Sequence, residues 1–141
     1  VIAMAGNVGV QSATIIVREF VNQDSTAATL RKNIVSEFYT AVANAFVFSL
    51  ITFIAMALIS LNFNWPTWVV ASAISLGLFF AMCFAGLIGS TAPLVFNRLN
   101  IDPAISSGPI ITVTVDVIGL TIYLGLSTII LNAFDINELQ F

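Results

Sequence analysis

The sequence predicts an all-α membrane protein, a polytopic helical bundle with about four transmembrane helices. Of its 141 residues, 59% are hydrophobic and only 8% are charged, and the mean hydropathy is +1.05. A soluble domain carries about 25% charged residues. The apolar residues also gather in long blocks, and a helix needs about 20 of them to cross the hydrocarbon core of a bilayer. Helices are expected rather than strands, because an open sheet leaves unpaired backbone groups in lipid.

The apolar blocks predict one partial transmembrane domain over residues 1–141, with helices over residues 1–17, 38–61, 66–96 and 103–131. The last block contains "IITVTVDVI", which favours a strand by propensity. The block is too long for one strand, however, and no barrel pattern surrounds it. The third block exceeds one perpendicular span, so we expect it to tilt, protrude or break near Gly86, Gly89 and Pro93.

The basic residues orient the predicted bundle. Arg18, Arg31, Lys32 and Arg98 are the only Lys and Arg residues of the chain. The positive-inside rule therefore places loops 18–37 and 97–102 in the cytoplasm and the C-terminus outside. Because the chain begins at Val1 inside an apolar run, we expect a fragment of a longer protein. With this orientation, a full protein whose N-terminus is cytoplasmic would need an odd number of spans before Val1.

The loop over residues 18–37 contains a candidate helix of its own. Asp24 and Ser25 are possible caps, and Leu30, Ile34 and Phe38 follow at four-residue spacing. This pattern is typical of a short amphipathic helix on the membrane surface. A linker with some helical content explains it equally well.

The composition excludes several classes of function. The chain has no histidine and one cysteine, Cys83, so neither a His/Cys metal site nor histidine-dependent catalysis is available. It has no basic run that would indicate nucleic acid, and no Gly-rich phosphate loop follows a strand. An intramembrane aspartic protease needs two convergent acids. Only Asp116 lies deep within an apolar block, so no enzymatic activity is expected.

Asp116 is the main functional candidate. It would lie about 9–12 Å inside the hydrocarbon core, at 1.5 Å per residue from the start of the last helix. A carboxylate at that depth is costly unless water, a cation or hydrogen bonds receive it. Helical spacing places small and polar residues on its face: Gly108, Thr112, Gly119, Tyr123 and Ser127. This pattern favours a helix that lines an aqueous path, and the alternative is an acid tied to another helix for packing.

Two further stripes follow helical spacing. Asn7 and Gln11, with Thr14 and Arg18, share a face of the first block. Their amide oxygens suit a hard cation or its water shell, but hydrogen bonding between helices explains them equally well. In the third block, small residues recur every four positions and predict close helix packing: Gly77, Ala81, Ala85 and Gly89.

Two segments resemble the MgtE family of magnesium channels and transporters. "DPAISSGPIITVTVDVIG" is similar to the last transmembrane helix of that family, and "AGNVGVQSATIIVRE" to its second helix. The sequence departs from the family pattern at Ala5, where glycine is frequent. The resemblance covers essentially the whole chain.

This resemblance implies spans two to five of a five-span domain. It also implies a homodimer in the inner (plasma) membrane and an absent cytoplasmic regulatory region. Asp116 from both subunits would hold hydrated Mg²⁺, the transported ion, and Asn7 would line the pore. The residues alone indicate only a hard cation. A proton- or Na⁺-coupled secondary transporter, with Asp116 as the coupling site, stays an alternative, as does a membrane assembly module that transports nothing.

Overall fold

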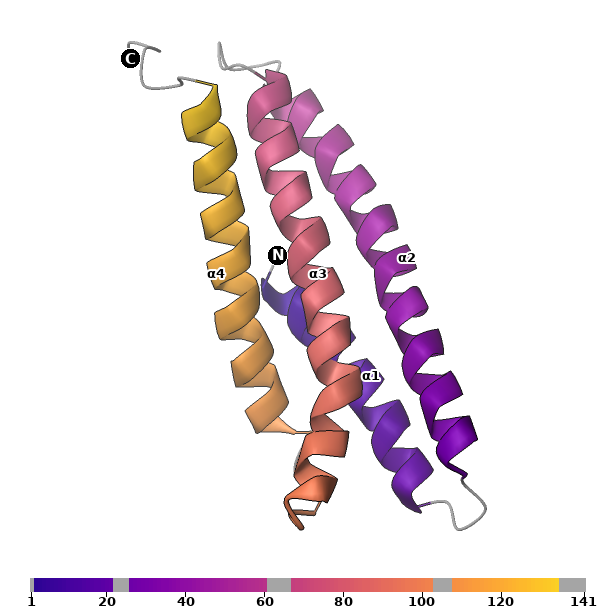
Figure 1. Ribbon diagram of the computed structural model, residues 1–141. Coiled ribbons are helices and arrows are strands. Elements are labelled where there is room, and N and C mark those ends of the chain that lie inside the picture. The colour runs from indigo at the N-terminus through magenta and orange to yellow at the C-terminus, as the bar shows by residue number, and fades with distance from the viewer. Residues whose placement is uncertain (1, 22–25, 61–66, 103–107, 135–141) are drawn as a thin grey trace.

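The computed structural model describes residues 2–21, 26–60, 67–102 and 108–134, and these residues form helices without any strand. Four helices follow in order: α1 (Ile2–Val21), α2 (Ala27–Ser60), α3 (Thr67–Arg98) and α4 (Pro109–Ala133) (Figure 1). The all-helical fold class is therefore confirmed. Among the described residues, three segments are long and apolar enough to cross a membrane: Ala27–Ile59, Trp68–Arg98 and Pro109–Ala133. The 20-residue α1 is not among them, because polar side chains interrupt it.

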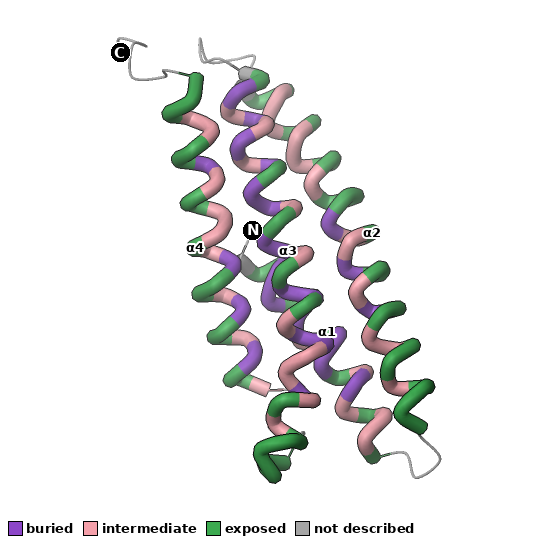
Figure 2. Tube along the Cα trace, viewed as in Figure 1, coloured by how far each residue is buried: buried purple, intermediate pink, exposed green. Residues whose placement is uncertain are grey.

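The helix α3 forms the centre of the bundle. It packs against all three other helices, and α1 also contacts α2 and α4. In Figure 1, α2 and α4 flank α3 on opposite sides, while α1 crosses behind it. Figure 2 shows buried residues concentrated on α1, α3 and the inner face of α4, with exposed residues along the outer side of α2. The outer faces of α2 and α4 carry large exposed apolar side chains, including Phe46, Leu58, Val113 and Leu124.

The start of α2 differs from the expectation. The helix α2 begins at Ala27, so the amphipathic segment expected on the membrane surface is its first part and not a separate helix. The Thr26 hydroxyl accepts a hydrogen bond from the Thr29 N–H at 3.2 Å and caps this helix. The expected caps Asp24 and Ser25 lie outside the described residues.

The helix α3 is continuous, so of the three possibilities for its length (a tilt, a protrusion or a break) the break near its glycines and Pro93 does not occur. It ends where Asn100 adopts a left-handed conformation (φ 56°) and the Ile101 N–H bonds back to the Phe96 carbonyl at 3.0 Å. The next helix, α4, starts at Pro109 with Gly108 as its N-cap.

All basic residues lie at one end of the bundle. The C-terminal ends of α1 and α3 and the N-terminal ends of α2 and α4 meet there (Figure 1). Arg18 and Arg98 belong to the last turns of α1 and α3, and Arg31 and Lys32 belong to the start of α2. This arrangement is the one that the charge pattern predicts for two loops on the same side of a membrane.

Candidate functional site

Asp116 lies on α4 where this helix meets α1. The residue is half-buried, and its Oδ1 atom is fully buried without a hydrogen-bond partner among the described residues. This atom faces the backbone of α1, because a Cβ added at Gly6 would lie 2.7 Å from it. A buried carboxylate oxygen without a partner is costly. Such a group is a functional candidate within a membrane segment.

The contact beside Asp116 is built from small residues. A Cβ at Gly119 would lie 3.5 Å from the Ala5 Cβ and 3.8 Å from the Ala81 Cβ. The spacing predicts Gly119 on the ion-path face, but the structure buries it within the bundle together with Ile111 and Val115. These three residues repeat every four positions, so they form the inner face of α4.

The polar stripe of α1 faces away from the core. Asn7, Gln11 and Thr14 are exposed, whereas the opposite face is buried through residues such as Ala13 and Ile16. The Thr14 hydroxyl donates to the Val10 carbonyl at 2.7 Å, so its polarity is satisfied within the helix. The amides of Asn7 and Gln11 lie on the outer surface of the bundle. In an apolar solvent such groups need water or another polar surface.

The other residues predicted to line the ion path are half-buried, unlike the exposed Asn7 and Gln11. Thr112 and Tyr123 are half-buried, and Tyr123 packs against Gly77 of α3. Gly108 is half-buried, and its carbonyl accepts hydrogen bonds from the N–H groups of Ile111 at 3.1 Å and Thr112 at 3.4 Å. That carbonyl therefore closes the first turn of α4 and is already engaged within the helix.

The small residues of α3 face α1 and α4. All four (Gly77, Ala81, Ala85 and Gly89) are buried. Gly77 lies against Tyr123 and Ser127 of α4, and the Ser127 hydroxyl donates to the Ala73 carbonyl of α3 at 3.3 Å. At the other end of the stripe, Gly89 lies directly on the backbone of Gly9. The absence of side chains thus lets α1 and α4 approach α3 closely.

Glu37 is a buried acid that the sequence assigned to a polar loop. Its side chain lies on α2 and is 9% exposed, and its Oε2 atom has no hydrogen-bond partner among the described residues. One turn further along α2, Ala41 contacts Gly86 of α3. The spacing of Glu37, Ala41 and Ala45, which are all buried, is the signal that could have identified it.

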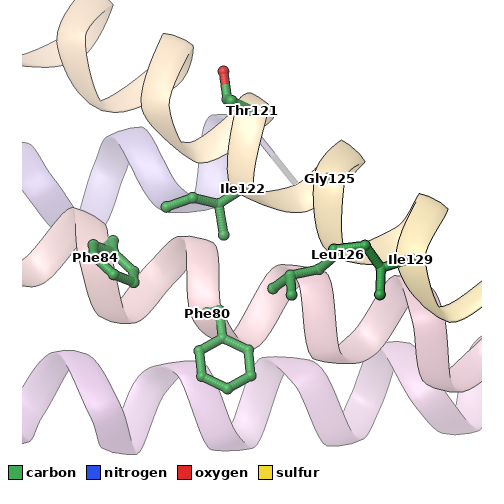
Figure 3. A pocket seen from close by; sticks show the side chains of 7 residues that line it. All are labelled: Phe80, Phe84, Thr121, Ile122, Gly125, Leu126 and Ile129. Atoms are coloured by element: carbon green, nitrogen blue, oxygen red, sulfur yellow. The ribbon is translucent and has the colours of Figure 1, made fainter.

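A groove between α3 and α4 lies apart from Asp116. It has a volume of about 360 Å³, and Phe80 and Phe84 of α3 line one wall (Figure 3). The α4 residues that complete it are Thr121, Ile122, Gly125, Leu126 and Ile129. This lining is almost wholly apolar and suits a hydrocarbon chain better than an ion.

The described part of the chain holds no group of three or more His, Cys, Asp or Glu side chains that could bind a metal ion. Among its described residues, the chain offers a single carboxylate, that of Asp116, at the α1–α4 contact. This donor set is too small to replace the water shell of a divalent cation, but it suits a cation that keeps its waters. Fold and site together define a polytopic helical membrane protein with an intramembrane acid between two helices.

Comparison with known proteins gives the family. Residues 1–126 match the profile of MgtE, described as a divalent cation transporter. The magnesium transporter MgtE of Bacillus subtilis (strain 168) is 31% identical over 128 residues, which cover 89% of this chain and 27% of the relative. The magnesium transporter MgtE of Thermus thermophilus is 30% identical over 128 residues, covering 91% of this chain and 27% of the relative. The magnesium transporter MgtE of Enterococcus faecalis is also 30% identical, over 130 residues.

The chain belongs to the MgtE family of divalent cation transporters. It spans about a quarter of the length of these relatives (27% and 28%). The resemblance seen in the two helical segments is thereby confirmed. The family transports ions and is not a family of enzymes, which agrees with the expectation from the sequence.

Proposed function

We propose that this chain is the ion-conducting part of a magnesium channel. Hydrated Mg²⁺ would pass along an axis between two subunits, lined by α1 and α4, with Asp116 of both subunits at its selectivity site. The observation that carries the proposal is the position of Asp116. A half-buried acid lies at the edge of the α1–α4 contact, on the helix pair that also exposes Asn7 and Gln11.

The chemistry of this edge suits hydrated Mg²⁺. Mg²⁺ sheds water reluctantly, so a binding site for it supplies one or two carboxylates and leaves several waters in place. One subunit provides one such carboxylate, and a symmetric pair provides two. The amide oxygens of Asn7 and Gln11 accept hydrogen bonds from the outer waters. The three relatives are all named magnesium transporters, which favours Mg²⁺ over other hard cations.

A homodimer also explains why α1 exposes a stripe of polar side chains. Lipid cannot satisfy the amides of Asn7 and Gln11, whereas a second copy of the same face encloses them together with water. We place this dimer in the plasma (inner) membrane. The basic end of the bundle, with loops 18–37 and 97–102, faces the cytoplasm, and the C-terminus lies outside.

Transport by the full-length protein in liposomes tests the proposal. Asp116→Asn keeps the size of the side chain but removes its charge, so Mg²⁺ flux should be abolished. Thr121→Val is the matched control on α4, because among the described residues the Thr121 hydroxyl donates only to its own helix, at the Val117 carbonyl (2.8 Å). Unchanged flux and ion selectivity in Asp116→Asn would refute the proposal.

Two other outcomes would replace the proposal by its alternatives. Strict coupling of flux to a proton or Na⁺ gradient would identify a secondary transporter. Loss of the dimer in Asp116→Asn without any change in cation binding would identify an assembly role for the acid.

A further inference from the structure

We propose that Gly6 is a positioning residue that holds the Asp116 carboxylate back from the ion path and thereby sets the preference for a hydrated cation. This inference rests on the proposed function of Asp116. In this inference α1 contributes to selectivity by positioning the Asp116 carboxylate and not by supplying a ligand to the ion.

The carboxylate approaches Gly6 edge-on. A Cβ at position 6 would lie 2.7 Å from Oδ1, 3.6 Å from Cγ and 3.9 Å from Oδ2 of Asp116. Oδ1 is also the atom that is fully buried without a partner. One carboxylate oxygen therefore rests in the space that the missing side chain leaves on α1. The other oxygen points away from that space and is the one left for the ion path.

A shift of α1 away from α4 is opposed on the other side of α1, where the Gly9 backbone rests directly on Gly89 of α3. The flexible group in this contact is the end of the Asp116 side chain. The added methyl group should therefore leave the fold intact and displace the carboxylate.

The displacement can be estimated from the contact distance. Ordinary contacts of a Cβ atom begin at 3.4 Å and Oδ1 lies at 2.7 Å, so the oxygen must move by the difference, about 0.7 Å. In a dimer the same shift occurs in both subunits, and the two carboxylates come closer to the axis. A narrower, more negative site favours direct coordination over contact through water. Ca²⁺ accepts such flexible direct coordination, whereas Mg²⁺ keeps its waters.

The experiment compares Gly6→Ala with wild type in the full-length transporter, with Mg²⁺ and Ca²⁺ flux measured separately in liposomes. We expect Mg²⁺ flux, and the ratio of Mg²⁺ to Ca²⁺ flux, to fall by roughly tenfold. Gly125→Ala on α4 is the control, because an added Cβ there meets no atom within 4 Å. It should leave both fluxes unchanged.

A double variant separates positioning from packing. Asp116→Ala removes the oxygen that the new methyl group meets, so adding Gly6→Ala should cost no further thermal stability in that background. An equal loss of stability in both backgrounds would overturn the inference, because Gly6 would then serve helix packing alone. An unchanged flux ratio in Gly6→Ala would also overturn it, and Asp116→Asn then decides separately whether the proposed function stands.

Discussion

The contact between Gly77 and α4 allows a quantitative test of the small-residue stripe. A Cβ at Gly77 would lie 2.8 Å from Cδ2 of Tyr123, 3.1 Å from the Tyr123 carbonyl oxygen and 3.2 Å from Oγ of Ser127. The Tyr123 ring can swing aside, but its carbonyl belongs to the backbone of α4. Ordinary contact begins at 3.4 Å, so Gly77→Ala forces α4 outward by about 0.3 Å.

That shift also affects the hydrogen bond between the helices. The Ser127 hydroxyl bonds the Ala73 carbonyl at 3.3 Å, already near the upper limit for such a bond. Overpacking a tight contact costs about 1–3 kcal/mol, and a hydrogen bond between membrane helices contributes about 0.6 kcal/mol. Alanine regains up to about 1 kcal/mol of helix propensity over glycine. We expect Gly77→Ala to lower the free energy of unfolding by about 1–2 kcal/mol.

Equilibrium unfolding in mixed micelles, followed by tryptophan fluorescence, measures this change. Ser127→Ala removes the hydrogen bond without adding volume and should cost only about 0.6 kcal/mol. Gly125→Ala adds the same methyl group where nothing lies within 4 Å, so it should be neutral or stabilising. If Gly77→Ala were as stable as Gly125→Ala, the contact derived for α3 and α4 would be wrong.

Two further substitutions probe the junction of α1, α2 and α3. Gly89→Ala places a methyl group against the Gly9 backbone, which cannot move aside as a side chain can. It should therefore lower the free energy of unfolding more than Gly77→Ala does in the same assay. An equal or smaller loss would contradict the contact between the two backbones. Glu37→Gln replaces a carboxylate whose Oε2 atom is buried without a partner among the described residues, so it should raise the free energy of unfolding by on the order of 1 kcal/mol or more. A loss of stability would show that the carboxylate has a stabilising partner.

The sequence predicted the helices and the main acid because both leave strong local signals. Long apolar blocks indicate α2, α3 and α4, and an acid such as Asp116 inside one of them is conspicuous in a membrane segment. The boundary of α2 was missed because several residues after Ala27 are polar or charged, and such residues suit a loop as well as an exposed helix. The helix begins at the Thr26 cap, among exposed residues.

Helical periodicity was less able to separate neighbouring faces. Gly119 follows Asp116 by three residues and Val115 by four, so its spacing fits the polar face and the buried face equally. Only the position of Ala5 and Ala81 places Gly119 inside the bundle. Glu37 was missed for a similar reason, since the pattern that buries it, four-residue spacing with Ala41 and Ala45, uses residues too small to mark a strongly apolar face.

The central place of α3 determines how a disturbance can travel through the bundle. The helices α2 and α4 share no contact among the described residues, while each packs along α3. Any mechanical coupling between the lipid-facing side of α2 and Asp116 must therefore be relayed by α3 or α1. Because glycine and alanine form those junctions, backbones transmit the motion directly, with no long side chain to absorb it.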